Sequence, residues 1–271
     1  MVMELTAVSA LHFSAAILTD ILERCFQDYF VPFSLTPEAF ALRFGSEGLS
    51  YEDSCVWLRG DEPVAIALIM RRAGAARLGA FAILPEYRGK GLARGMLTPL
   101  FTTLKAKGIS PFYLEVIHEN TAAIALYEAL GFRISQGLWG FKGETTDVRM
   151  NGELREATLN DLLRAVWSAP GERMPWQLDP LSLHLMPCEI ISDGAGAWAA
   201  FTTHNMKPLL RFLFVAPGSR GQGHARRMLQ NLSALHPGIC TPVAVPERFA
   251  PLFASAGYQP LAITQFEMTQ G

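Results

Sequence analysis

Two short basic, glycine-rich stretches have residue types and spacing that could bind phosphate groups. RGKGLARGML runs from Arg88 to Leu97, and RGQGHARRML runs from Arg220 to Leu229. Each follows an apolar segment and opens a predicted helix. The first turn of a helix presents free N–H groups and a partial positive charge, and glycines let a ligand approach closely. Each stretch therefore predicts a cradle for phosphate or pyrophosphate, with Arg88 and Lys90 adding positive charge in the first copy.

Aligned without a gap, the stretches Arg88–Leu97 and Arg220–Leu229 have the same residue at seven of ten positions. The separation of the copies is too long for a solenoid or propeller repeat, which spans about 20–50 residues. A chain of 271 residues favours two domains, since a domain has roughly 100–200 residues. We therefore expect a first domain at 1–145 and a second at 146–271, joined by a polar linker at 143–147. One copy alone could be a turn that merely starts a helix, but the repeat favours a binding role.

A dinucleotide-binding fingerprint is an alternative interpretation of Gly89, Gly91 and Gly95. That fingerprint needs a βαβ unit and an acidic residue about 20 residues farther on, at the end of the next strand. Glu115 lies within its predicted strand and not at the end, and the second copy has Arg227 in place of Gly95. The strands before the motif also look antiparallel. A dinucleotide-binding protein is therefore the less favoured alternative.

Hydrophobic periodicity predicts the elements that position the first copy. Thr36, a following proline and an acid fit a capped helix start. The apolar run at 76–84 fits a strand covered on both faces. The predicted helices are 11–28, one from Thr36, one from the glycine-rich stretch to about 107, and 120–130; the strands are about 54–59, 63–71, 76–84, 111–117, 132–135 and 138–142.

The second half repeats this order more loosely. Prolines and tryptophans interrupt any periodicity at 168–187, so no element is predicted there. The predicted helices are 159–167, one from the second glycine-rich stretch to about 235, and 247–256; the strands are 188–192, 196–203, 208–215, 239–245 and 258–268.

Composition and charge exclude several function classes. The net charge of -2 argues against a general nucleic-acid binder, which would usually be basic. The scattered cysteines, Cys25, Cys55, Cys188 and Cys240, indicate free thiols in a reducing compartment and no metal site. The N-terminal segment lacks the positive charge of a signal peptide, and no stretch reaches the about 18 apolar residues of a membrane span. We expect a cytoplasmic monomer or homodimer with no membrane or nucleic-acid partner.

Residues downstream of the first copy complete a longer pattern. Pro85-x-x-Arg-Gly-x-Gly-x-Ala precedes a helix, and LEV at 114–116, Asn120 and LYEALGF at 126–132 follow. This combination resembles the GNAT acyltransferase superfamily, and within it the bacterial ribosomal-protein N-terminal alanine acetyltransferases. The resemblance covers 50–142 well and 188–260 more weakly. It implies an α/β (α+β) fold of two tandem GNAT-like domains, each a mixed, splayed β-sheet flanked by helices.

The resemblance also implies acetyl-CoA as the co-substrate, bound where the middle strands of the first sheet part. Backbone groups of Phe81, Ala82 and Ile83 would hold the pantetheine arm and the acetyl carbonyl. Asn120 and Tyr127 match further family positions that touch the cofactor. The residues that would hold the pyrophosphate are those of the glycine-rich turn, namely Arg88, Gly89, Lys90, Gly91, Leu92, Ala93 and Arg94.

Acetyl transfer to an amine requires one proton to leave the ammonium and one to reach the departing thiolate. Tyr127 stands where the resembled enzymes place the acid, and a phenol of pKa about 10 stays protonated at neutral pH. The spacing from Glu115 to Tyr127 is the one that those enzymes show between base and acid. An N–H near Ile83 would meet the oxyanion. His118 and Glu119 are alternative bases, and without the motif Tyr127 could be core and Glu115 an ordinary strand residue.

The second copy departs from the pattern farther on. Aligning the Gly-aromatic pairs after the last helices places Phe253 opposite Tyr127 and Pro246 opposite Asn120. Phenylalanine keeps the packing but has no proton to donate, and proline has no amide side chain. We therefore expect a degenerate second domain that binds CoA weakly or not at all and is catalytically silent.

The acceptor would enter beside the aromatic segments 25–33 and 137–141, which could equally form a seam onto the second domain. A small-molecule amine or a peptide N-terminus would fit, and tandem members of the superfamily include mycothiol synthases, so a thiol conjugate stays open. The expected function is acetyl-CoA-dependent N-acetyltransfer by direct attack in the first domain. A non-catalytic CoA-binding sensor or scaffold is the alternative.

Overall fold

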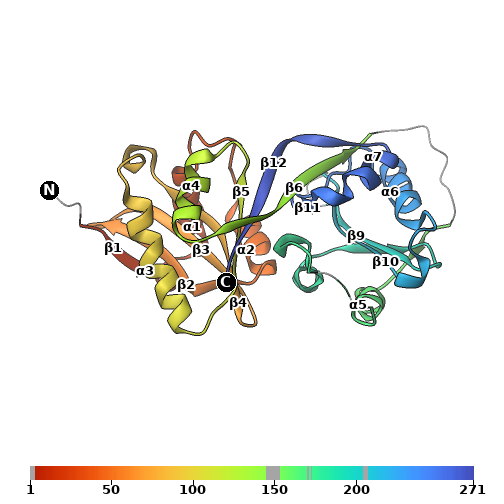
Figure 1. The fold of residues 1–271 in the computed structure, drawn as a ribbon, viewed down its shortest axis with the longest axis horizontal. Coiled ribbons are helices and arrows are strands. Elements are labelled where there is room, and N and C mark those ends of the chain that lie inside the picture. Colours follow the sequence, from red (N-terminus) through yellow and green to blue (C-terminus); the bar gives the residue numbers. More distant parts are fainter. Residues whose placement is uncertain (1–3, 145–152, 170, 172, 204–206) are drawn as a thin grey trace. The chain divides into compact units, whose positions relative to one another are not determined.

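The computed structural model describes residues 4–144, 153–169, 171, 173–203 and 207–271. The chain forms two compact units (Figure 1). Unit 1 is Met1–Ser135 with Met268–Gly271, and unit 2 is Gln136–Glu267. Strands β6 (Arg133–Gly143) and β12 (Tyr258–Gln270) each begin in one unit and end in the other. The predicted linker at 143–147 lies mostly outside the described residues, so the domain boundary at 145 stays a prediction.

Unit 1 contains an antiparallel meander and one strand that pairs in parallel. Strands β1 to β4 pair antiparallel in chain order, and β5 pairs in parallel with β4. The strands are β1 (Thr6–Ser9), β2 (Leu49–Arg59), β3 (Glu62–Arg72), β4 (Ala75–Ile83) and β5 (Phe112–Ile117). The predicted strands β2 to β5 and the mixed sheet are confirmed, while β1 was not predicted because so short a strand carries too little periodicity.

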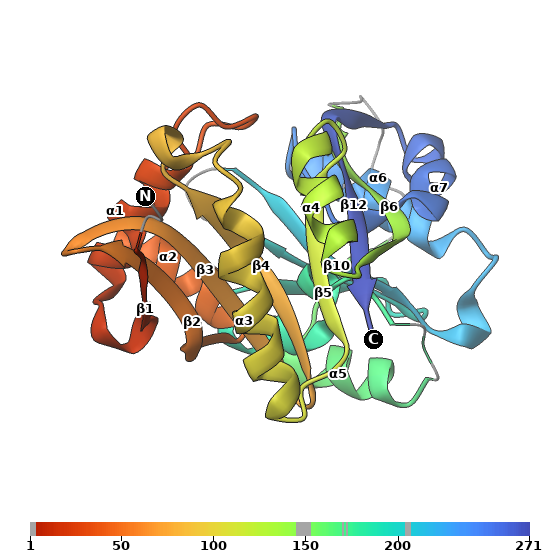
Figure 2. The same cartoon turned by 60° about the vertical axis from the view of Figure 1, so that its left-hand side comes forward.

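Helices cover both faces of this sheet. In Figure 2, α1 (Ala15–Cys25) and α2 (Pro37–Ser46) lie over one face, and α3 (Leu92–Ala106) lies over the other. Helix α4 (Thr121–Ala129) follows β5. The predicted cap at Thr36 is confirmed, because its side chain accepts the N–H of Ala39 at 3.2 Å and satisfies a donor that the helix leaves free.

Strands β4 and β5 pair over a short stretch and then part. The pairs are Ala76–Phe112, Arg77–Tyr113 and Leu78–Leu114. Beyond Leu78, β4 continues to Ile83 against β3 alone. The pairing of β3 and β4 shifts register between Leu78 and Ala80, so Gly79 is the extra residue of a β-bulge that bends β4. The sheet of unit 1 is therefore splayed, as predicted.

Unit 2 contains a second antiparallel sheet, in the order β10-β9-β8-β7. The strands are β7 (Arg155–Glu156), β8 (Glu189–Ser192), β9 (Ala197–Thr202) and β10 (Leu209–Val215). A second group of strands runs in the order β12-β6-β11, with β11 at Val245–Pro246. The helices are α5 (Leu159–Trp167), α6 (His224–Leu235) and α7 (Ala250–Ser255), and all three were predicted.

Three parts of the secondary structure differ from prediction. The two short strands predicted at 132–135 and 138–142 are one strand, β6, which continues through Gly137. The glycine accommodates a close neighbour and does not form a turn, since a Cβ on Gly137 would lie 2.6 Å from the Glu247 carboxylate. The strand predicted at 239–245 is interrupted: Cys240 forms isolated bridges to Lys142 and Leu209, and Val245 begins β11, whereas Pro242 between them lacks the N–H that a continuous ladder needs. The segment 168–187 contains two short 3-10 helices, Trp176–Leu178 and Pro180–Leu185.

Gly48, in the turn from α2 to β2, yields a stability prediction. Its φ is +87°, and a Cβ there would lie 2.6 Å from the backbone oxygen of Arg71. Gly48→Ala should lower the free energy of unfolding by about 1–3 kcal/mol, measured by urea denaturation. Gly45→Ala, within α2 and with open space around its Cβ, should be neutral or stabilising by up to about 1 kcal/mol. Equal effects of the two substitutions would contradict the prediction.

Candidate functional site

The glycine-rich turn between β4 and α3 has the geometry of an anion cradle. Gly89 and Gly91 have φ of +70° and +73°, a conformation that favours glycine. A Cβ on either glycine would meet nothing within 4 Å, so the space over the turn is open. Gly91 caps α3 without a side-chain hydrogen bond, which leaves the first-turn N–H groups, at 92–94, directed outward. These features fit a pyrophosphate.

Arg88 uses its guanidinium on backbone carbonyls. Its Nε donates to the oxygen of Ile83 at 2.9 Å, and its Nη2 donates to the oxygens of Cys25 at 2.9 Å and Gln27 at 2.8 Å. Lys90, by contrast, is exposed and holds its ammonium 5.3 Å from the ring centroid of Tyr87. The charge expected for the cradle therefore reaches the surface at Lys90, whereas the donors of Arg88 join β4 to the segment after α1.

The last residues of β4 direct backbone groups away from β3. The N–H of Leu84 donates to the oxygen of Val64 at 2.9 Å. Because N–H groups alternate along a strand, the N–H groups of Phe81 and Ile83 point to the other side, where β5 has already parted from β4. Ala82 is buried. An extended ligand could bond to this free edge as a further strand would.

Tyr127 is a buried phenol on α4. It is 7% exposed and packs edge-to-face on Phe132 with 6.1 Å between ring centroids. Burial raises the pKa of Tyr127 above its usual value, and the neighbouring Tyr29 raises it further. The hydroxyl is therefore protonated at any physiological pH, which is the state that a proton donor requires.

The turn from β5 to α4 brings a second tyrosine to this place. The Oδ1 of Asn120 accepts the N–H of Ala123 at 3.1 Å and so caps α4, while its Nδ2 donates to the hydroxyl of Tyr29 at 3.4 Å. Burial raises the pKa of Tyr29, against the opposing effect of this hydrogen bond. His118 and Glu119 are exposed in the same turn.

Glu115 lies where β4 and β5 part, in a buried group of charged residues. The Nε and Nη2 of Arg77 contact its Oε2 at 2.6 and 2.5 Å, and the Nη1 of Arg77 contacts the Oε2 of Glu47 at 2.5 Å. The side chains of Arg77, Glu115 and Glu47 are 3%, 4% and 7% exposed. Burial disfavours the charge on Arg77, but the two carboxylates outweigh it and raise the pKa of the guanidinium. Sequence reasoning missed Arg77 and Glu47, because no local pattern marks a charge pair between distant elements.

Unit 2 repeats the backbone of the cradle, but a side chain lies over its second glycine. Gly221 and Gly223 have φ of +75° and +80°, and the Nε of Arg220 donates to the oxygen of Val215 at 3.1 Å, as Arg88 does to its own strand in unit 1. However, a Cβ on Gly223 would lie 3.0 Å from the Nη1 of Arg227. That guanidinium donates to the oxygen of Gln222 at 2.9 Å and occupies space that is open in unit 1.

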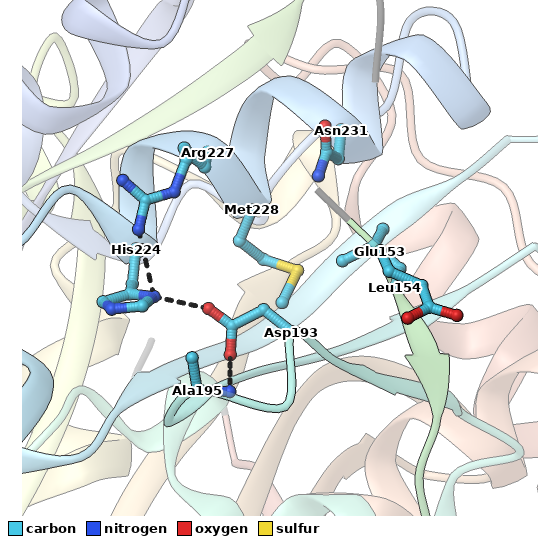
Figure 3. Close-up of a pocket in the computed structure, with 8 residues that line it drawn as sticks. All are labelled: Glu153, Leu154, Asp193, Ala195, His224, Arg227, Met228 and Asn231. Carbon is cyan, nitrogen blue, oxygen red and sulfur yellow. Dashed lines mark hydrogen bonds and ion pairs between the residues drawn. The ribbon is translucent and has the colours of Figure 1, made fainter. Parts of the chain in front are cut away.

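Arg227 also lines a small cavity beside α6 (Figure 3). The Nδ1 of His224 lies 2.6 Å from the Oδ2 of Asp193, and the Nη2 of Arg227 lies 3.2 Å from the same nitrogen. Burial would raise the pKa of Asp193, but the N–H groups of Ala197 and Ala195, with His224, hold it below its usual value. The cavity measures about 140 Å³ and is lined by Glu153, Leu154, Asp193, Ala195, His224, Arg227, Met228 and Asn231.

The aromatic pairs after the last helices support the alignment of the two copies. Phe253 packs edge-to-face on Tyr258 with 5.5 Å between centroids, and this pair has the same spacing along the chain as Tyr127 and Phe132 in unit 1. In unit 2 the hydroxyl is on the other ring and donates to the backbone oxygen of Leu229 at 3.1 Å. The phenol of unit 2 thus bonds within the core instead of standing in the place of Tyr127.

A glycine turn follows the fourth strand of a meander, this strand parts from the fifth, and a tyrosine lies on the helix after the fifth. Together these features define the class. Residues 16–132, which lie in unit 1, match the acetyltransferase (GNAT) family, so this part of the chain is similar to the members of that family. This agrees with the resemblance found in the sequence. In a dinucleotide-binding fold the glycine loop would follow the first strand of a βαβ unit, so that alternative loses its support.

Particular relatives can be named within the class. The chain is 33% identical over 100 residues to the [ribosomal protein bS18]-alanine N-acetyltransferase of Escherichia coli K12, which is 37% of this chain and 65% of that enzyme. It is 38% identical over 72 residues to the enzyme of that name from Haemophilus ducreyi, which is 27% of this chain and 50% of that enzyme. The chain thus spans less than two thirds of the length of these relatives.

Solved structures match the fold of the whole chain. A GCN5-related N-acetyltransferase from Sphaerobacter thermophilus aligns with a TM-score of 0.71 at 16% identity, over 98% of this chain and 95% of its own. A tandem GNAT protein from the clavulanic acid biosynthesis pathway aligns with a TM-score of 0.66 at 13% identity, over 98% of each chain. The predicted fold of two tandem GNAT-like domains is confirmed.

Membrane-spanning helices and metal-binding groups are two further features to consider in the described residues. No helix in the described part of the chain is long and apolar enough to span a membrane. The described part of the chain also holds no group of three or more His, Cys, Asp or Glu side chains arranged to bind a metal ion.

The buried position of Arg77 yields a second stability prediction. Arg77→Met removes a cation that contacts two buried carboxylates, and it should lower the free energy of unfolding by about 3–5 kcal/mol. Arg24→Met is the matched control, since Arg24 pairs with Asp20 and Glu62 on the surface, where a pair contributes about 1 kcal/mol or less. Urea midpoints of the two variants measure the difference, and similar midpoints would refute the structural role of Arg77.

Proposed function

We propose that the protein is an acetyl-CoA-dependent N-acetyltransferase whose reaction takes place in unit 1. One contrast between the copies carries the proposal. Unit 1 combines an open glycine cradle with the buried Tyr127, whereas in unit 2 Arg227 lies over Gly223 and Phe253 stands in place of the tyrosine. A unit that keeps both features can bind the cofactor and protonate the leaving thiolate.

The residues present fit the cofactor. The pyrophosphate would bond to the first-turn N–H groups of α3, at 92–94, over Gly89 and Gly91, with Lys90 and Arg94 exposed beside it. The pantetheine arm would lie along the free edge of β4 at 81–83. Acetyl-CoA supplies the thioester. The chain contributes the N–H of Ile83, which points to the same edge and could stabilise the oxyanion.

Tyr127 is the proposed acid and Glu115 the proposed base. The raised pKa of Tyr127 keeps its proton in place until a thiolate forms nearby. Glu115 lies against the guanidinium of Arg77, and a carboxylate can accept the ammonium proton directly or through water.

The proposed acceptor is a primary amine, either a peptide N-terminus or a small molecule. The names of the relatives describe transfer to the alanine of a ribosomal protein, which supports a peptide N-terminus with alanine first. The segment after α1, with Tyr29, Phe30 and Phe33, is the proposed acceptor side of the site, because Tyr29 already lies against Asn120.

Tyr127→Phe tests the proposed acid. It removes only the hydroxyl, so kcat for a peptide with N-terminal alanine or for small amines should fall about 10²–10⁴-fold while the KM for acetyl-CoA changes little. Phe253→Tyr should leave both constants unchanged. If Tyr127→Phe retains full turnover while Arg220→Met abolishes it, the active unit is unit 2. Tight CoA binding without turnover of any amine would instead indicate the sensor.

The contrast between the cradles predicts one CoA per chain. Gly91→Val should weaken CoA binding by about tenfold or more, because a branched side chain would occupy the open space and disfavour the positive φ. Gly223→Val, its counterpart in unit 2, should leave the affinity unchanged. Isothermal titration gives both affinity and stoichiometry. Two equivalent sites would show that Arg227 does not close the second cradle.

A further inference from the structure

The arginines that begin the two glycine-rich stretches make one hydrogen bond of the same kind and differ in two others. Arg88 and Arg220 both donate from Nε to the carbonyl that ends the preceding strand, at Ile83 and Val215. Only Arg88 also donates from Nη2 to Cys25 and Gln27, 63 and 61 residues away. The common bond explains why both copies keep the arginine, and the additional bonds require a separate explanation.

The additional bonds hold the segment that leaves α1. Cys25 is the last residue of α1, and Asp28 has a φ of +58°, which is costly for a residue other than glycine. The ring of Phe26 packs on those of Tyr29 and Phe33, with 4.9 and 5.0 Å between centroids. A strained conformation persists only where its surroundings fix it, and two charge-assisted bonds beside Asp28 do so.

This conformation determines where Tyr29 lies. Tyr29 follows Asp28 directly, and its hydroxyl accepts a hydrogen bond from Asn120 at 3.4 Å. Asn120 in turn caps the helix that carries Tyr127. A chain of contacts therefore runs from the glycine cradle, through Arg88 and the backbone after α1, to the hydroxyl of Tyr29 beside the proposed acid.

We propose that Arg88 is a positioning residue for the acceptor and not a phosphate ligand: it fixes the segment at 25–29 so that Tyr29 presents its hydroxyl to the incoming amine. The inference rests on the proposed function. A guanidinium is suited to this role because its rigid fork reaches Ile83, Cys25 and Gln27 at once. A lysine at the same place would keep the charge and lose the geometry.

The test separates this role from phosphate binding. In Arg88→Met and Arg88→Lys, the KM for the acceptor, a peptide with N-terminal alanine, should rise about tenfold or more. The Kd for CoA, measured by titration, should stay within about threefold of the wild-type value. Amide hydrogen exchange at 26–31 should become faster in both variants. Tyr29→Phe should raise the acceptor KM without changing this exchange, and Arg220→Met, the matched control, should change none of these quantities.

A phosphate-binding role gives different results. Arg88→Met would then weaken CoA binding at least about tenfold, Arg88→Lys would restore it, and exchange at 26–31 would not change; that outcome overturns the proposal. Should Arg88→Met fail to fold, Arg88→Lys carries the same three measurements. Should the wild type acetylate no peptide or amine, the proposed function fails, while the CoA titration and the exchange experiment still decide the role of Arg88.

Discussion

The site depends on the place where β4 and β5 part. Arg77 contacts Glu115 on β5 and Glu47 at the end of α2, so a buried charge cluster fixes three elements at the last paired residues of the two strands. Beyond it, one edge of β4 is left for a ligand, and β5 carries the chain to the turn that begins α4. A hydrophobic contact could fill the same space, but it would lack the directionality of these hydrogen-bonded charge pairs.

Local physics in the sequence accounts for most elements and for the cradle. Helical periodicity with capping residues placed α2, α5 and α6 to within a few residues. Glycines at 89 and 91 predicted a turn that other residues disfavour, and their positive φ agrees with this. The strand predicted at 239–245 is present only as bridges at Cys240 and as Val245, because Pro242 between them has no N–H for a continuous ladder.

Other parts of the site could not be predicted from the sequence. Arg77 and Glu115 are 38 residues apart, and their contact depends on the register of a parallel strand pair that no local pattern encodes. Arg88 was expected to contribute charge to the cradle, but its partners are backbone oxygens, which every residue possesses and which no sequence motif distinguishes. The differences between the copies were more informative. Arg227 stands in place of Gly95 and lies over Gly223. Phe253 stands in place of Tyr127, and the hydroxyl of unit 2 is on Tyr258.

The crossing of β6 and β12 between the units makes unit 1 depend on residues from the far end of the chain. Met268–Gly271 belong to unit 1, where the side chain of Gln270 donates to the backbone oxygen of Leu130 at the end of α4. A fragment that stops after residue 135 would therefore lack the piece of chain that closes the helix of Tyr127. Deletion of the second half of the chain would remove part of unit 1 as well. Expression of unit 1 alone requires a permuted chain in which this last strand is rejoined to it.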